Sequence, residues 1–203
     1  NFSAVDIDSD ELTFSVFDIP NEVESNLTSI GNTATLSLSS PTNYTGSSTI
    51  TVTVDDNDGG SDSQNFTLTV QNVNDPPVLN FIPNQTMDED STLNNIPVSA
   101  TDVDNASLTF SAESSNSNNV SVNVQQLAQK SATLQLQSHN NFVGTETISV
   151  QVTDGGRTDS QNFTITVGAV NDAPQLNDIS DVQIFEGGNT TVSLSAQDID
   201  SDE

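Results

Sequence analysis

Apolar and polar residues alternate along four stretches of this chain. Residues 49–54 read T-I-T-V-T-V, and residues 147–152 read T-I-S-V-Q-V. Residues 66–70 and 163–167 also place an apolar side chain at every second position. Such alternation is typical of strands that turn one face to a core and the other to water, as in antiparallel sheets. No segment has a helical period, so the sequence predicts a β protein.

Turn sequences separate the strands of each strong pair. D-N-D-G-G-S-D occupies residues 56–62 and D-G-G-R-T-D occupies residues 154–159, and glycine pairs flanked by aspartate favour hairpins. Weaker strands are predicted near residues 78–82, 95–100, 107–112, 120–124 and 133–137. With the hairpin they give about seven strands per hundred residues, which predicts a Greek-key β-sandwich of immunoglobulin-like size.

The chain repeats itself with a period of 96 residues. An Ala-x-Asp-x-Asp motif begins at Ala4, Ala100 and Ala196, and S-A-V-D-I-D-S-D-E at residues 3–11 returns as S-A-Q-D-I-D-S-D-E at residues 195–203. So long a period indicates an array of domain-sized units. Asn-Asp followed by proline, as in N-V-N-D-P-P at 72–77 and A-V-N-D-A-P at 169–174, ends a strand and stiffens the connection.

Three units follow from these linkers. Residues 1–73 are predicted to form repeat 1, which lacks its first strand, and residues 74–170 a complete repeat 2. Residues 171–203 are the N-terminal part of repeat 3. Because the linkers are short, we expect the units to be joined end to end. The overlap between the two ends of the sequence indicates a segment of a longer array.

The composition is strongly acidic. Two Lys and Arg residues stand against 29 Asp and Glu, a formal charge of −27, which argues against nucleic acid and anionic membrane surfaces as partners. No apolar run approaches the roughly 20 residues of a membrane span. High charge also suits a disordered chain, but the alternating strands argue against disorder. The acids recur at fixed places in each repeat, which favours bound cations.

Calcium is the cation that these residues suit best. The chain has no cysteine and one histidine, so zinc, copper and haem sites are not expected. Calcium takes six to eight oxygen ligands, and two carboxylates on one Asp-x-Asp loop repel each other unless a cation lies between them. The alternative is that Asp-x-Asp and Asp-Gly-Gly are ordinary turn sequences. Their recurrence favours calcium.

At these motifs the chain resembles cadherins and the bacterial cadherin-like tandem repeats of large surface and secreted adhesins. The V-N-D-P-P and V-N-D-A-P linkers are similar to the cadherin interdomain signature. A-T-D-V-D at 100–104 resembles the family's Asp-x-Asp loop, and V-T-D-G-G at 152–156 resembles its Asp-Gly hairpin. N-F-V-G-T at 141–145 is similar to the segment before the sixth strand in the bacterial repeats. The resemblance covers the whole chain and implies cadherin-like sandwiches.

The resemblance also implies calcium ions at each junction between repeats, held by one domain's lower end, the linker and the next domain's upper end. The implied ligands are Asn72, Asn74, Asp75, Asp102, Asp104 and Asp154 between repeats 1 and 2; Glu89, Asn171, Asp172, Asp198 and Asp200 between repeats 2 and 3; and Asp6, Asp8 and Asp56 toward an upstream domain.

Two departures from the family reduce the expected ion count. The animal Leu-Asp-Arg-Glu motif has no counterpart, and residues 40–46 and 138–144, which take its place, lack acids. Ala169 stands where the family has its first linker acid, and Asn72 is the amide version of that residue. One or two ions per junction are therefore expected instead of three.

No catalytic constellation is apparent. A lone loop histidine, His139, is typical of an exposed surface position. Asp88, Glu89 and Asp90 include a carboxylate pair of the kind that glycoside hydrolases use, but so tight a cluster favours a metal ligand or a solvated turn. Lys130 and Arg157 are expected on the surface. We therefore do not expect an enzyme.

The sequence supports three classes of function. The first is a calcium-rigidified structural or adhesive stalk segment of an extracellular or cell-surface protein, bacterial by its resemblance, whose partners are its neighbouring repeats or like chains in a filament. The second is a module that binds a surface glycan or a like repeat. The third is an accessory segment of a secreted enzyme. In one variant, repeats 1 and 3 complement each other between chains by strand exchange.

Overall fold

The computed structural model describes residues 1–8 and 11–200. Residues 9–10 and 201–203, which belong to the two longest motif copies, lie outside the described residues. Every regular element in the described residues is a β-strand, which confirms the all-β prediction. The chain divides into two compact units, one of Asn1–Asn74 and one beginning at Asp75, and each is described by itself.

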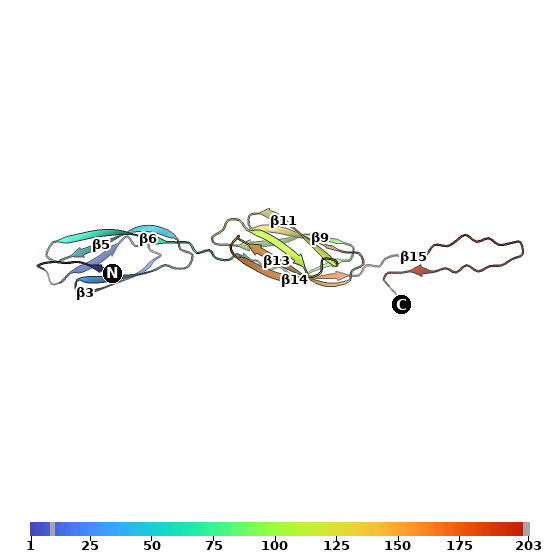
Figure 1. Ribbon diagram of the computed structural model, residues 1–203, viewed down its shortest axis with the longest axis horizontal. Helices are drawn as coiled ribbons and strands as arrows, with labels where there is room; N and C mark the ends of the chain where they lie inside the picture. The colour runs from blue at the N-terminus through green and yellow to red at the C-terminus, as the bar shows by residue number, and fades with distance from the viewer. Residues whose placement is uncertain (9–10, 201–203) are drawn as a thin grey trace. The chain divides into compact units, whose positions relative to one another are not determined.

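Repeat 2 lies in the second unit and forms a sandwich of two four-stranded sheets (Figure 1). One sheet has the order β10-β13-β14-β8 and the other the order β11-β12-β9-β7. Only the β14–β8 pair is parallel. The strands are β7 (Val78–Leu79), β8 (Gln85–Asp88), β9 (Thr92–Thr101), β10 (Thr109–Ser114), β11 (Val120–Ala128), β12 (Ser131–Ser138), β13 (Gly144–Thr153) and β14 (Thr158–Gly168). The chain passes from one sheet to the other after β7, β8, β9, β10 and β12, which confirms the Greek-key sandwich.

The first strand differs from the prediction. A single strand was expected near residues 78–82, but β7 and β8 are separate and belong to different sheets. Pro83 lies between them and has no N–H to donate to a ladder. Side chains of β14 hold the crossing segment instead. The Leu79 N–H donates to Asp159 Oδ2 at 2.8 Å, while Gln161 donates to the Leu79 carbonyl at 2.9 Å and accepts the Ile82 N–H at 3.3 Å.

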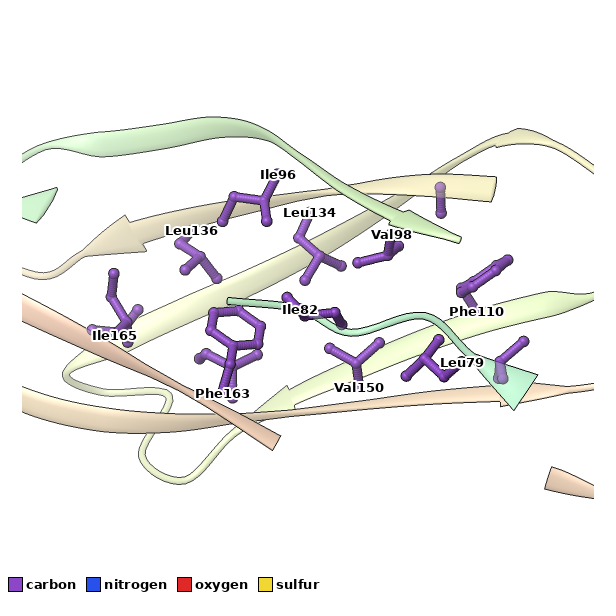
Figure 2. Close-up of a cluster of buried hydrophobic side chains, with 14 of the residues drawn as sticks. Leu79, Ile82, Ile96, Val98, Phe110, Leu134, Leu136, Val150, Phe163 and Ile165 are labelled. Carbon is purple, nitrogen blue, oxygen red and sulfur yellow. The ribbon is translucent and has the colours of Figure 1, made fainter. Parts of the chain in front are cut away.

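The core of repeat 2 lies between its two sheets. Residues at alternate positions of β13 and β14 are buried, as the period-two pattern predicts, and they meet buried side chains of β9 and β12 (Figure 2). Leu79 and Ile82, from the crossing segment, belong to the same cluster. Full burial of an aliphatic side chain contributes about 1.5–3 kcal/mol, so the paired sheets are held mainly by this cluster.

Repeat 1 forms two three-stranded sheets in the first unit, with orders β1-β4-β3 and β2-β5-β6. Its strands are β1 (Phe2–Ser3), β2 (Thr13–Phe17), β3 (Glu24–Ile30), β4 (Thr33–Ser39), β5 (Gly46–Asp55) and β6 (Ser61–Val70). The β5–β6 pair carries the predicted 49–54 and 66–70 strands. Within the described residues of this unit, no strand takes the place that β7 and β8 occupy in repeat 2.

Residues 171–200 contribute one short antiparallel pair to the second unit. Leu176 in β15 (Gln175–Leu176) lies opposite Ala196 in β16 (Ala196–Gln197). The apolar residues of this segment, among them Leu176, Ile179 and Ile184, are exposed. No helix of the described residues is long and apolar enough to cross a membrane.

Candidate metal centres

The Asp-x-Asp loops fold the same way in all three copies. In each loop the backbone N–H of the second aspartate donates to Oδ1 of the first, the geometry of an Asx turn. The donor and acceptor pairs are Asp8 and Asp6 at 2.8 Å, Asp104 and Asp102 at 2.8 Å, and Asp200 and Asp198 at 3.1 Å. The first aspartate therefore fixes the loop and keeps both carboxylates at the same end of the sandwich.

Each linker is attached to the following loop by one hydrogen bond that recurs at both junctions. The Asp75 N–H donates to Asp104 Oδ2 at 2.6 Å, and the Asp172 N–H donates to Asp200 Oδ2. The predicted linker acid thus lies beside the second acid of the loop in both cases. Asn72 is exposed and Asn74 half-buried at the end of the first unit.

Asp102 has a buried oxygen that lacks a partner. Its Oδ1 accepts the N–H groups of Asp104 and Asn105, at 2.8 and 2.7 Å, but its Oδ2 is buried without a hydrogen bond. Lys130 is half-buried, against the sequence expectation, because its ammonium donates to the Asp102 carbonyl at 2.8 Å. A buried carboxylate oxygen without a partner is destabilising. Such an oxygen is suited to be a ligand of a hard cation.

A cavity of about 330 Å³ lies where repeat 2 meets the third Asp-x-Asp loop. Three predicted ligands, Glu89, Asn171 and Asp200, line it. The other lining residues are Asn141, Val143, Ala169, Val170 and Ile199. Glu89 is only 5% exposed, and its Oε1 accepts the Val170 N–H at 2.7 Å. The glutamate therefore ties the linker backbone to the end of β8.

Asn141 is a candidate that the sequence analysis did not select. It lines the cavity, its backbone has φ of 60°, and its N–H donates to Asp90 Oδ1 at 3.0 Å. Its counterpart one repeat earlier, Asn43, has φ of 63°. Asparagine tolerates this left-handed conformation better than most residues. An asparagine at the same place in S-P-T-N-Y-T-G and S-H-N-N-F-V-G was the signal available in the sequence.

Negative charge gathers around Asp172. Partial burial, followed by the charges of Asp200, Asp90, Glu89 and Asp198, raises the pKa of the Asp172 carboxyl above its ordinary value. The charged form is therefore disfavoured in the folded linker. Both a proton and a bound cation would relieve this repulsion.

The raised pKa gives the linker an unusual pH dependence. In calcium-free buffer we expect the Val170 and Asp172 amides to gain hydrogen-exchange protection as the pH falls from neutral toward about 4, because protonation removes the repulsion. Asp172→Asn should give that protection already at neutral pH. Exchange measured by NMR checks this, with Asp178→Asn, an exposed aspartate of the same segment, as the control. Loss of protection on acidification in the wild type would contradict it.

The two hairpin aspartates have a turn role that explains their position without a metal. Asp56 Oδ1 accepts the N–H groups of Asp58 and Gly60, which hold the pKa of the Asp56 carboxyl below its ordinary value. Asp154 Oδ1 accepts the N–H groups of Gly156 and Arg157, both at 2.6 Å.

Most of the predicted acids thus bind backbone N–H groups in this structure. Within residues 1–8 and 11–200, no three or more His, Cys, Asp or Glu side chains are already arranged around one point as metal ligands. The loops bring Asp75 beside Asp104, and Glu89 beside the linker that carries Asp172. Calcium at these positions stays a proposal.

A family model described as "Bacterial Ig domain" matches residues 1–69 and 74–166. No curated protein sequence matches the chain.

Solved cadherin structures have the same fold. "Protocadherin gammaB7 EC3-6 cis-dimer structure" aligns with 98% of this chain and 51% of its own, at TM-score 0.62 and 18% identity. "Crystal structure of human CDH23 EC21-23" aligns with 93% of this chain and 68% of its own, at TM-score 0.51 and 15% identity. "Endo-fucoidan hydrolase MfFcnA4 from glycoside hydrolase family 107" reaches only TM-score 0.39, at 19% identity over 79% of this chain. The chain spans 24% of that hydrolase and about half of the protocadherin.

Proposed function

Because this chain belongs to the bacterial Ig domain family and folds into cadherin-like sandwiches, we propose that it is a non-enzymatic structural segment of an extracellular surface protein, stiffened by calcium at its repeat junctions. The observation that carries the proposal is the linker-to-loop hydrogen bond. It joins Asp75 to Asp104 and Asp172 to Asp200 in the same way. Because this hydrogen bond recurs at both junctions, it supports a role in fixing the junction.

The acids fall into two sets with different tasks. Asp6, Asp102 and Asp198 fold the loops through Oδ1. Asp104 accepts the Asp75 N–H of the first linker. Asp200 and Glu89 accept the Asp172 and Val170 N–H groups of the second linker. Calcium, when bound, would supply a double positive charge to oxygens that otherwise repel. The residues that would hold it are Asp75, Asp102 and Asp104 at the first linker, and Glu89, Asn141, Asn171, Asp172 and Asp200 at the second.

Stiffness follows from where these contacts lie. A hinge between two sandwiches bends at its linker, and these linkers are tied by hydrogen bonds to acids of rigid strands and loops. Neutralising the charge of those acids favours the state in which the linker N–H groups are hydrogen-bonded over the state in which these bonds are broken. A chain made in a low-calcium interior would stay pliable for export and stiffen outside. This supports a stalk or spacer that holds other domains away from the cell.

A glycan-binding role has less support. Flat exposed aromatic side chains, chiefly of tryptophan and tyrosine, are the usual platform for sugars. This chain has no tryptophan, and its only tyrosine, Tyr44, is half-buried with its ring close to Gly46. Phe81 and Phe185 are exposed, but phenylalanine has no polar group for a sugar hydroxyl. Structural support is the function that the geometry favours.

Small-angle X-ray scattering of the full chain tests the proposal. We expect excess calcium to give the scattering of a stiff particle and a chelator to give that of a flexible one. The variant Asp104→Asn with Asp200→Asn keeps an acceptor for both linker N–H groups but removes two charges. It should lose the response to calcium. Asp178→Asn with Asp181→Asn removes the same charge from exposed positions and should keep it. Identical profiles with calcium and chelator would refute the proposal.

A further inference from the structure

Lys130 occupies an unusual place for a basic residue in so acidic a chain. It is the only lysine in a sequence with a formal charge of −27, and Arg157 is the only other basic residue besides the histidine. The side chain is half-buried, and its ammonium donates a hydrogen bond of 2.8 Å to the backbone carbonyl of Asp102. One of two permanent positive charges on side chains therefore lies on the loop that is proposed to hold calcium.

The turn that carries Lys130 holds both ends of this loop through its backbone. Gln129 and Lys130 form the turn between β11 and β12. The Ala100 N–H, just before the loop, donates to the Lys130 carbonyl at 3.1 Å. The Leu108 N–H, just after the loop, donates to the Gln129 carbonyl at 2.6 Å. Because backbone groups make both bonds, neither bond depends on the side chain at position 130.

Repeat 1 makes the same backbone bond without a lysine. The Ala4 N–H donates to the Asn32 carbonyl at 3.0 Å. Asn32 lies in the turn between β3 and β4, as Lys130 lies in the turn between β11 and β12. An asparagine is therefore sufficient for this turn. The charge of Lys130 is an addition to the fold, and its contact with the Asp102 carbonyl indicates that it acts on the loop.

The ammonium acts on the loop in two opposite ways. Without calcium, its charge offsets part of the repulsion between Asp104 and the neighbouring acids Asp75 and Asp102, and its hydrogen bond holds the Asp102 backbone. With calcium, the same charge repels the incoming ion, and this repulsion is stronger where burial excludes water. The ammonium binds the Asp102 carbonyl, while the buried Oδ2 of that residue is without a hydrogen bond. The lysine therefore opposes the ion without occupying the carboxylate oxygen.

We infer that Lys130 holds the calcium-free Asp102 loop in place and lowers the calcium affinity of the first linker. The inference rests on the proposed function, because it concerns the same calcium site. The loop is then ordered before calcium arrives, and the linker fills with calcium only at a high concentration outside the cell. As a consequence, the stiffness of the junction follows changes in calcium near that concentration.

A calcium titration of the full chain followed by NMR tests the inference at each linker separately. The Asp75 and Asp104 amides report the first linker, and the Val170 and Asp172 amides report the second as an internal reference. Lys130→Met keeps the apolar part of the side chain and removes the charge. It should lower the calcium concentration at the midpoint of the first linker about tenfold. The midpoint of the second linker should stay the same.

Three further variants separate the charge from other effects. Lys130→Asn introduces the residue that repeat 1 has in this turn and should behave as Lys130→Met does. Lys130→Arg keeps the charge and should keep the midpoint close to that of the wild type. Asn162→Asp changes the net charge by the same amount at an exposed position of β14, and should leave the midpoint unchanged because salt screens a remote surface charge.

The outcomes distinguish the inference from the proposed function. Equal midpoints of the wild type and Lys130→Met, or an equal shift at both linkers, would overturn the inference and leave the proposed function standing. A wild type that binds no calcium at either linker would refute both.

Hydrogen exchange in chelator gives a readout that needs no calcium. The Asp104 and Asn105 N–H groups donate to Asp102 Oδ1, so their exchange reports whether the loop is closed. Lys130→Met should speed their exchange about tenfold or more, because a hydrogen bond to a charged group is lost. Lys130→Arg should exchange as slowly as the wild type. Unchanged exchange in Lys130→Met would show that the lysine does not hold the loop and would overturn the inference.

Discussion

Calcium at about a thousand times its dissociation constant is expected to raise the free energy of unfolding of repeat 2 by about 4 kcal/mol, because binding to the folded state alone stabilises that state by mass action. Bound calcium would relieve the repulsion among the acids around Asp172 and would give the buried oxygen of Asp102 a partner. For a domain of this size, the melting temperature should rise by about 15 °C or more. Differential scanning calorimetry in calcium and in chelator measures the shift.

A variant that removes two of the proposed calcium ligands separates calcium binding from general screening of charge by salt. Asp104→Asn with Asp200→Asn should keep most of its stability in chelator and lose most of the calcium response. Matched ionic strength with sodium chloride should give only a small shift, since screening acts on all surface acids alike. Equal melting temperatures of the wild type in calcium and chelator would contradict the prediction.

Leu79→Ala is expected to destabilise repeat 2 by about 3 kcal/mol, within the usual range of 2–5 kcal/mol for a buried leucine. Leu79 is 3% exposed and lies in the core at the point where the chain crosses from one sheet to the other. The loss should lower the melting temperature by about 10–20 °C. Urea unfolding followed by circular dichroism gives the change in free energy directly.

The sequence has its own control for this variant. Leu176 has the same position in the repeat but is 58% exposed, so Leu176→Ala should change the free energy of unfolding by less than about 0.5 kcal/mol. Similar losses for both alanine variants would mean that Leu176 is as buried in solution as Leu79.

Local pattern was sufficient to predict most of the fold. The alternating residues of β13 and β14 are buried at every second position, because a strand with one face in a core has a period of two. The division of the first strand into β7 and β8 could not be predicted in this way. It depends on Pro83 together with hydrogen bonds from Asp159 and Gln161, residues about 80 positions away in the sequence.

The sequence was sufficient to predict which residues form the candidate site, but not the hydrogen bonds that they make. The motifs identify Asp102, Asp104 and their repeats as loop acids, and the structure places them in such loops. The hydrogen bond from the linker N–H to the second acid could not be predicted, because it depends on the path of the backbone. The buried oxygen of Asp102 was equally hidden, since burial is decided by the packing around the loop.

The crossing segment of repeat 2 also sets a folding order. β7 pairs with β9, about 20 residues away, at Val78–Thr101 and Leu79–Ala100. The bonds to Asp159 and Gln161, by contrast, join Leu79 and Ile82 to β14 across 79 to 82 residues, and β8 pairs only with β14. Closing so long a loop is slow compared with forming a hairpin. In a repeat that emerges N-terminus first, β7 is therefore able to pair with β9 early, whereas β8 waits undocked until β14 follows.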